Sequence, residues 1–314
     1  MYELKKLKSA DQFNSDVINA RLNHNDLEDY SLFETPAIKT DCLFTDINKL
    51  VVNNDEYKTV INPDTNRTFG IVKKDFKLVN HLDVFPSITK KMISLFGNNI
   101  EIIDTSYNYG AYASRQFIFN DITHDLNKAN TNLKEDDIVK MSLTIFNGLG
   151  GNASLGGIGN AFRLTCLNGQ VSLKNMFKLI FRHTKNLDVS VFNHASGRIA
   201  ECFHQQVKEF NIMRDISINY NDVRFILEST IAKVKEIKDQ SKERSNPKMD
   251  TILSQFDKEK IKLGSTLYAF YNALTHYSTH VDTSKGSILS SENARTKDVL
   301  LVLNNPVFKP VYAS

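Results

Sequence analysis

The chain of 314 residues contains 41% hydrophobic and 24% charged residues with only 13 glycines and 6 prolines, which excludes collagen-like, low-complexity and wholly disordered proteins. Its formal net charge is +3, but residues 161–314 carry 22 Lys and Arg against 15 Asp and Glu, whereas residues 1–60 carry 7 against 11. A cluster of positive charges attracts a polyanion more strongly than the net charge of the whole chain does. The basic second half therefore favours a phosphate-bearing partner.

The sequence indicates a protein that stays in the cytoplasm and has no membrane partner. No apolar run approaches the roughly 20 residues that span a bilayer, and the first residues contain no apolar stretch of signal-peptide length. Cys42, Cys166 and Cys202 are odd in number and lack CxxC spacing, so they predict buried thiols rather than a disulfide framework or a zinc ribbon. We expect neither a cofactor nor a metal.

The first half of the chain predicts an irregular extension followed by strands. Residues 1–56 are polar and acidic without sustained periodicity, whereas residues 57–72 predict a hairpin around an Asn- and Pro-containing turn. Apolar spacing over residues 84–96 predicts a helix with Pro86 in its first turn. Further strands are expected over 100–103, 105–119 and 140–146. Because polar tips rather than long helices separate these strands, they favour an antiparallel sheet.

The second half predicts one more strand and then helices. Alternation from Phe162 to Cys166 predicts a strand that ends at Asn168–Gly169. Apolar residues at helical spacing from Val171 to Phe181 predict a helix with Lys174, Lys178 and Arg182 on its other side. We expect helices over 189–212, 220–240 and 261–281, an exposed loop over 241–248 and a final strand over 299–303.

These elements predict an α+β fold, an antiparallel sheet with helices packed on one side and a helical C-terminal half. The predicted organisation is an N-terminal extension over residues 1–56, an α+β core over 57–185, and a helical region over 186–314 that completes the same domain.

Two groups of residues are candidates for contact with nucleic acid. The densest basic group could bind the phosphate backbone, although a solvated helix face would give the same pattern; it comprises Arg163, Lys174, Lys178, Arg182, His183 and Lys185. Tyr107 and Tyr109 alternate on one predicted strand face, and with Arg115 they could stack unpaired bases. Tyrosines in strands are otherwise core or rim residues.

Signatures of catalysis are weak. Residues 148–159 hold six of the 13 glycines, but no Gly-Lys-Ser/Thr follows, so a sharply turning connection between strands competes with a phosphate cradle. His276 and His280 have the i, i+4 spacing of zinc ligands, with Asp282 nearby, but Tyr277 replaces the glutamate of the metalloprotease motif. We therefore assign no catalytic residue and predict a protein that is not an enzyme.

Several of these segments resemble the uncharacterised phage/plasmid-like protein family. The resemblance covers residues 57–305 and is carried by the run from Phe162 to Gly169, by Arg182-His183-Thr184, by the helix around Tyr271-Asn272, and by Asp75 to Asn80. The family's glycine loop often contains an acidic residue, which is missing from Asn147 to Ser154. This departure puts a metal or catalytic role of the loop in doubt.

The resemblance implies a protein of phages and mobile elements, acting in the host cytoplasm near replication and recombination. By analogy of architecture, the expected fold is similar to the single-strand annealing recombinases of phages. The leading hypothesis is therefore a homo-oligomeric protein that binds or anneals single-stranded DNA without a chemical step. The alternatives are a non-enzymatic host-interaction or structural phage protein, and a metal-dependent enzyme using His276, His280 and Asp282.

Overall fold

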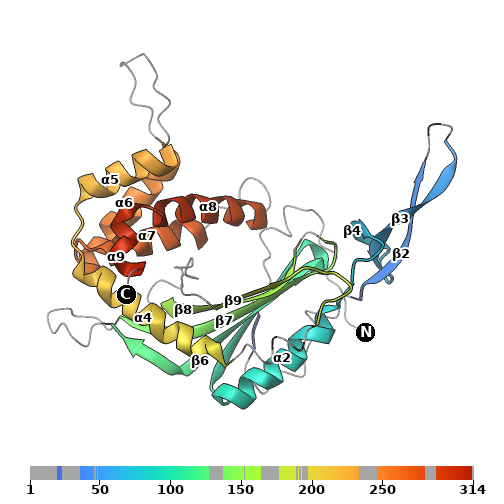
Figure 1. Cartoon of the computed structure of the whole chain (residues 1–314), viewed down its shortest axis with the longest axis horizontal. Helices are drawn as coiled ribbons and strands as arrows, with labels where there is room; N and C mark the ends of the chain where they lie inside the picture. Colours follow the sequence, from blue (N-terminus) through green and yellow to red (C-terminus); the bar gives the residue numbers. More distant parts are fainter. Residues whose placement is uncertain are drawn as a thin grey trace, which may run out of the picture. The chain divides into compact units, whose positions relative to one another are not determined.

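The structure is a computed structural model that describes residues 20–22, 36–45, 47, 49–126, 137–151, 153–163, 177–188, 190, 192, 197–232, 246–279 and 288–312. Its strands form a three-stranded and a six-stranded sheet with antiparallel pairing (Figure 1). Most of the helices follow the strands in the chain. The predicted α+β class with an antiparallel sheet and a helical C-terminal half is confirmed.

The chain divides into two compact units that alternate along the sequence. The first comprises residues 1–121, 142–159 and 177–200, and the second comprises residues 122–141, 160–176 and 201–314. The sequence predicted consecutive segments over residues 1–56, 57–185 and 186–314, and that division stays a prediction. No helix in the described part of the chain is long and apolar enough to cross a membrane.

The three-stranded sheet consists of β2 (Ile38–Thr45), β3 (Val51–Asn62) and β4 (Arg67–Lys73), in that order. The hairpin predicted over residues 57–72 is confirmed as β3 and β4, but β2 and the first half of β3 lie in the segment expected to be irregular. Because β4 pairs only with Tyr57–Asn62, the remainder of β3 pairs with β2 alone. We call this two-stranded end, residues 42–54, the arm.

The six-stranded sheet has the order β1-β5-β6-β7-β8-β9. Its members are β1 (Ala20–Leu22), β5 (Ile100–Tyr107), β6 (Tyr112–Asp125), β7 (Ile138–Gly148), β8 (Leu155–Arg163) and β9 (Phe177–Phe181), and a 3-10 turn, η3 (Asn108–Gly110), connects β5 to β6. The strands predicted between residues 100 and 146 are thus confirmed.

The helix predicted over residues 171–181 is wrong for its last five residues, which form β9. Lys178 and Ile180 are exposed while Phe177 is buried, the alternation of a strand, and β9 pairs with the glycine-rich strand β8. A short apolar run fits both a helical and a strand period, so pairing with β8 decides the structure.

The helix α2 (His81–Phe96) packs on the six-stranded sheet, where Phe96 meets Phe119 edge-on. Its start is fixed by Asn80, whose backbone N–H donates to the Asp83 carboxylate, and it ends at Gly97 with φ 85°. The predicted helix is confirmed but begins three residues earlier. Pro86 therefore lies in the second turn of the helix rather than in the first. In the second turn, its ring removes one backbone hydrogen-bond donor.

The remaining helices are α4 (Arg198–Asp215), α5 (Tyr220–Leu227), α6 (Pro247–Leu263), α7 (Leu267–Thr279), α8 (Ile288–Leu303) and α9 (Lys309–Tyr312), with short turns η4 (Glu228–Ala232) and η5 (Pro306–Phe308). Gly264, with φ 72°, separates α6 from α7, so the helix predicted over 261–281 is two helices. The strand predicted over 299–303 is wrong: Val299, Val302 and Leu303 are buried at the helical spacing.

Candidate nucleic-acid interface

Two segments that follow edge strands lie side by side in the first unit. The backbone N–H of Lys77 donates to the carbonyl of His183 over 3.0 Å, and the His183 Nδ1 lies 3.0 Å from the Lys77 carbonyl oxygen. The Lys77 Nζ donates to the Leu187 carbonyl, and the Phe76 and His183 rings stack at 4.8 Å. These contacts fix residues 73–77 beside residues 182–187.

Exposed cations flank this contact from both sides. Lys73, Lys74, Arg182 and Lys185, which we call the basic junction, are all exposed, and none pairs with a carboxylate within the described residues. The Nζ of Lys39 reaches the same place and donates to the Lys74 and Phe76 carbonyl oxygens. Asp75 is an acidic residue within this group. The junction therefore presents four cations that form no ion pair with a described carboxylate, on a fixed backbone.

Lys178 adds another exposed cation, on β9. It is exposed and pairs in register with Ile158 of β8. Because side chains alternate along a strand, Lys178, Ile180 and the flanking Arg182 point to one face. The sequence placed Lys178 and Arg182 together on a helix, and they share a strand face instead.

His183 holds the junction together rather than offering a charge to a ligand. Its side chain is buried against Phe76, and burial lowers its pKa, although the contact with the Lys77 carbonyl opposes the shift. Its Nδ1 must carry the proton to donate to that carbonyl, which leaves Nε2 buried without a hydrogen-bond partner in the described structure. We therefore remove His183 from the candidate phosphate contacts.

Arg115 is not at the surface. Its side chain is 0% exposed, its Nε and Nη2 donate to the Asp104 carboxylate at 2.7 Å, and its Nη1 donates to the Thr89 hydroxyl. The prediction that Arg115 stacks bases conflicts with this burial, because reaching a base would break the ion pair and expose the core. Its role is to join α2 to β5 and β6.

Tyr109 lies under an arginine that the sequence did not single out. The guanidinium carbon of Arg67 is 3.2 Å from the centroid of the Tyr109 ring, and Tyr109 has a left-handed backbone with φ 59°. Arg67 is exposed and Tyr109 is half-buried, so the guanidinium covers one ring face. A base could stack on the outer plane of Arg67. The backbones of Arg163 and Tyr107 belong to β8 and β5, but their side chains, like all of Lys174, lie outside the described residues.

Sequence reasoning missed Lys73 and Lys74 as well as Arg67. The adjacent lysines at the end of a predicted hairpin were visible, but their relation to Arg182 depends on a contact between segments about a hundred residues apart, here Lys77 with His183. The segments that carried the family resemblance, Asp75 to Asn80 and Arg182 to Thr184, are the two that meet.

The glycine cluster serves packing. A Cβ on Gly156 would lie 2.3 Å from the Phe146 ring, and one on Gly157 would lie 2.7 Å from the Phe192 ring. Glycines in β8 thus make room for aromatic rings, and the turn between β7 and β8 lies against β4 through Gly150 and Gly70. These packing contacts explain why glycine occupies these positions, so no phosphate cradle is needed to explain the cluster.

The buried His81 links the start of α2 to the turn between β5 and β6 and to the end of β7. His81 is fully buried; its Nε2 lies 2.8 Å from the Gly110 carbonyl oxygen and its Nδ1 lies 3.1 Å from the Asn147 Nδ2. The Asn147 amide also donates to the Val79 carbonyl. Burial lowers the pKa of His81 to about 4, so the ring is neutral at pH 7, with Nε2 donating to Gly110 and Nδ1 accepting from Asn147.

Acidification is expected to destabilise the protein through His81. The folded pKa of about 4 lies below the ordinary 6.5, so unfolded chains bind a proton first, and stability falls from pH 6.5 towards pH 4. His81 should account for a loss of about 2 kcal/mol by pH 5. Urea unfolding at several pH values should show a flatter dependence for His81→Asn. NMR titration of the wild-type imidazole checks the pKa directly, and a value near 6.5 would contradict the prediction.

Of the three residues in the metal alternative, only His276 is among the described residues. His276 lines an open polar pocket of about 400 Å³ beside α6 and α7, with Asp250, Thr251, Ser254, Gln255 and Lys258. His280 and Asp282 lie outside the described residues. Within the part of the chain that is described, no three His, Cys, Asp or Glu side chains are grouped to hold a metal ion.

Comparison with known proteins adds a family. A family model described as a domain of unknown function (DUF932) matches residues 68–301, which include the basic junction and most of the helices. No curated protein and no solved structure matches the chain.

Proposed function

Because the chain belongs to the DUF932 family, whose function is unknown, its activity must be inferred from its own residues, and we propose that it binds single-stranded DNA through the basic junction. The observation that carries the proposal is the contact between Lys77 and His183, which brings four exposed, unneutralised cations together from two distant segments. Cations without carboxylate partners attract phosphate groups without reading base sequence.

The proposed activity involves no chemical step. Contacts of Lys178, Arg182 and Lys185 with the phosphate backbone of the DNA would leave the bases accessible for pairing. The Arg67–Tyr109 pair offers a plane on which an unpaired base can stack. Such a protein would coat or anneal single strands as a homo-oligomer during phage-type recombination or replication in the host cytoplasm. The alternative, a host-interaction or structural protein, predicts no affinity for DNA.

Reversing charge at the basic junction is expected to abolish most of the DNA affinity. The variant Lys74→Glu/Arg182→Glu/Lys185→Glu should bind a fluorescein-labelled single-stranded oligonucleotide at least about tenfold more weakly near 50 mM salt. The wild-type affinity should fall steeply between about 50 and 200 mM salt, and removing three phosphate contacts should lower the salt slope by about 2. Fluorescence anisotropy measures both quantities.

The control carries the same change of charge elsewhere. Lys90, Lys208 and Lys297 are exposed on α2, α4 and α8, and Lys90→Glu/Lys208→Glu/Lys297→Glu should retain most of the affinity. Equal weakening in both variants would remove the junction as the binding site. Absence of wild-type binding at low salt would end the proposal and favour the host-interaction alternative.

A further inference from the structure

The two segments of the basic junction are joined by contacts that centre on His183. The Lys77 N–H donates to the His183 carbonyl, and the His183 Nδ1–H donates to the Lys77 carbonyl, each over 3.0 Å. The imidazole ring also stacks on the Phe76 ring, with 4.8 Å between the ring centroids and 19° between the planes. One side chain thus supplies a hydrogen bond and an aromatic contact between residues 73–77 and residues 182–187. We call these bonds the Lys77–His183 contact.

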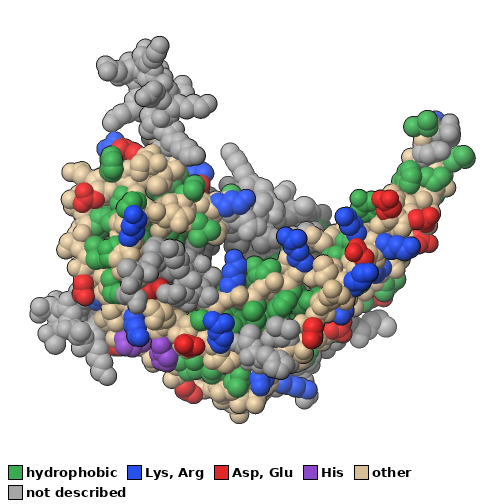
Figure 2. All heavy atoms as spheres, viewed as in Figure 1, with side chains coloured by type: hydrophobic (Ala, Val, Ile, Leu, Met, Phe, Trp, Pro, Cys, Tyr) green, Lys and Arg blue, Asp and Glu red, His purple; other side chains and the backbone are tan. Residues whose placement is uncertain are grey.

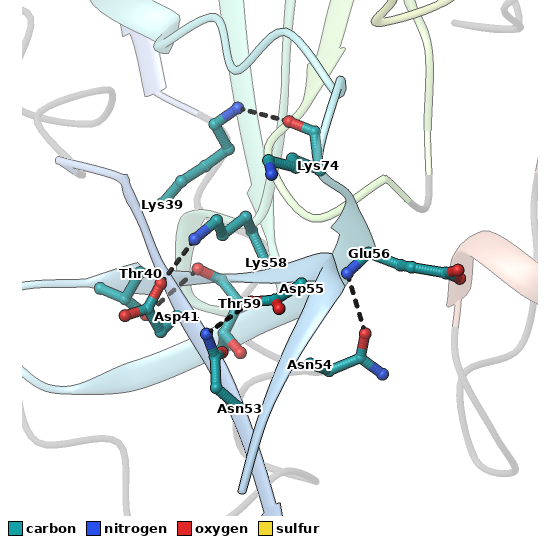
Figure 3. A network of polar contacts seen from close by, with 10 residues as sticks. All are labelled: Lys39, Thr40, Asp41, Asn53, Asn54, Asp55, Glu56, Lys58, Thr59 and Lys74. Atoms are coloured by element: carbon teal, nitrogen blue, oxygen red, sulfur yellow. Dashed lines mark hydrogen bonds and ion pairs between the residues drawn. The ribbon is translucent and has the colours of Figure 1, made fainter.

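The other bonds at this place come from groups that keep their charge near neutral pH. The Lys39 Nζ reaches from β2 to the Lys74 carbonyl oxygen over 3.3 Å (Figure 3). The Lys77 Nζ donates to the Leu187 carbonyl over 2.7 Å. Ammonium groups titrate at about pH 10, whereas an imidazole titrates at about pH 6.5. Near neutral pH, the His183 ring is therefore the group of this contact whose charge can change.

The closed contact has no place for a second proton on His183. The residue is 7% exposed, and its Nε2 has no hydrogen-bond partner in the described structure. A proton on Nε2 would create a buried, charged donor without an acceptor, which costs more free energy than a neutral donor in the same place. Protonation therefore favours a form in which the ring leaves the Phe76 stack and reaches water.

The surroundings of His183 also disfavour a positive ring. Exposed cations from both segments and from β2 lie around the contact: Lys39, Lys73, Lys74, Arg182 and Lys185. Figure 2 shows Lys and Arg side chains, in blue, beside the three-stranded sheet. His81 of α2 lies close enough for its charge to interact with that of His183. The neighbouring carboxylates are exposed, so solvent screens their attraction; they are Glu56, Asp75 and Asp188.

We propose that acid opens the Lys77–His183 contact, so that single-stranded DNA binds the junction with a neutral His183 and its affinity falls on acidification. His183 is then a positioning residue, which acts through the cations that it holds together. An exposed histidine would give the opposite sign, because an imidazolium at the surface attracts phosphate. Burial decides the sign here, because an unsatisfied buried charged donor costs more than an exposed ion pair gains.

The pH range of the opening follows from the imidazole of the opened form. Burial lowers the pKa of His183 in the closed contact, although the bond to the Lys77 carbonyl opposes the shift. The opened form has the ordinary pKa of 6.5 and takes up the proton first, so the closed form is most favoured above pH 6.5 and becomes less favoured as the pH falls below it. Between pH 7.5 and pH 5.5, the ratio of closed to opened molecules should fall about tenfold.

Hydrogen exchange of the Lys77 N–H tests the opening without DNA. Its protection, corrected for the intrinsic exchange rate, should fall about tenfold from pH 7.5 to pH 5.5. His183→Gln keeps an amide donor that cannot titrate, so the protection of Lys77 should be independent of pH in this variant. Because His81 is intact there, a loss of protection caused by His81 would persist and would overturn the inference. His204→Gln, at an exposed histidine of α4, is the matched control and should behave like the wild type.

NMR titration of the wild-type His183 ring keeps the inference testable if the glutamine variant loses the contact altogether. The ring should remain mostly neutral at pH 6.5, where an ordinary imidazole is half protonated. A ring that is half protonated at pH 6.5 or above would contradict the acid-sensitive contact.

The DNA step rests on the proposed function and has its own readout. Fluorescence anisotropy with a labelled single-stranded oligonucleotide at constant salt should show an affinity about three- to tenfold lower at pH 5.5 than at pH 7.5 for the wild type, and no such change for His183→Gln. A wild-type affinity that rises or stays constant on acidification would overturn the coupling. Absence of binding at pH 7.5 would overturn the proposed function and the coupling with it, whereas hydrogen exchange would still decide whether acid opens the contact.

Discussion

Substituting Gly70 with alanine is expected to destabilise the protein by roughly 3 kcal/mol or more, because the new methyl group has no room. An ideal Cβ on Gly70 would lie 2.2 Å from the Gly150 carbonyl oxygen and 2.9 Å from its carbonyl carbon. Both neighbours are backbone atoms, so rotation of a side chain cannot relieve the clash. Strand β4 and the turn after β7 would have to separate.

Chemical denaturation of Gly70→Ala against the wild type measures this effect. Gly197→Ala is the matched control, since a Cβ on Gly197 meets nothing within 4 Å, and its stability should change by less than about 1 kcal/mol. Gly150→Ala attacks the same contact from the other side, with a Cβ 2.2 Å from the Phe69 carbonyl oxygen, and should be similarly severe. Wild-type stability in Gly70→Ala would disprove the close approach of the two backbones.

Removal of the Arg115 guanidinium should cost about 3 to 5 kcal/mol of stability. Arg115→Met keeps much of the aliphatic bulk but leaves the Asp104 carboxylate 1% exposed without its two hydrogen bonds. Burial already raises the pKa of Asp104, and the bonds from Arg115 oppose that shift. Without them the pKa rises further, so the loss of stability should shrink as the pH falls and the carboxyl group takes up a proton.

A double-mutant cycle separates the lost pair from lost packing. Arg115→Met/Asp104→Leu should recover much of the stability, because no uncompensated charge remains buried. Arg224→Met is the matched control: it breaks an exposed i, i+4 pair with Glu228 and should cost no more than about 0.5 kcal/mol. Equal losses in Arg115→Met and Arg224→Met would contradict the assignment of a structural role to Arg115.

The sequence could predict the local elements and the fold class, because turn residues and strong apolar periods act within a few residues of each other. It could not distinguish β9 from a helix, since Phe177 to Phe181 satisfy both periods and the outcome depends on pairing with β8. The burial of Arg115 was partly visible, because Ala113, Arg115 and Phe117 alternate on one face. Its partner was not, since Asp104 faces Arg115 only in the register of β5 and β6.

The candidate site shows the same limit. Arg182 and Lys185 were identified from local charge, whereas Lys73 and Lys74 join them through the contact of Phe76 with His183. The arm escaped notice because the apolar pairs Leu43–Phe44 and Leu50–Val51 are separated by mostly polar residues and form a surface only when β2 pairs with β3. A single sequence does not reveal which residues far apart in the chain contact each other.

The alternation of the two compact units along the chain has a consequence for any attempt to dissect the protein. Each unit is assembled from three stretches, and the boundaries at residues 121/122, 141/142 and 159/160 fall inside β6, β7 and β8. No single cleavage or truncation point therefore releases either unit whole, and a fragment that starts at α4 lacks the strand ends that complete the second unit. Deletion mapping of this protein would report misfolded pieces, so its surfaces are better separated by point substitutions in the full-length chain.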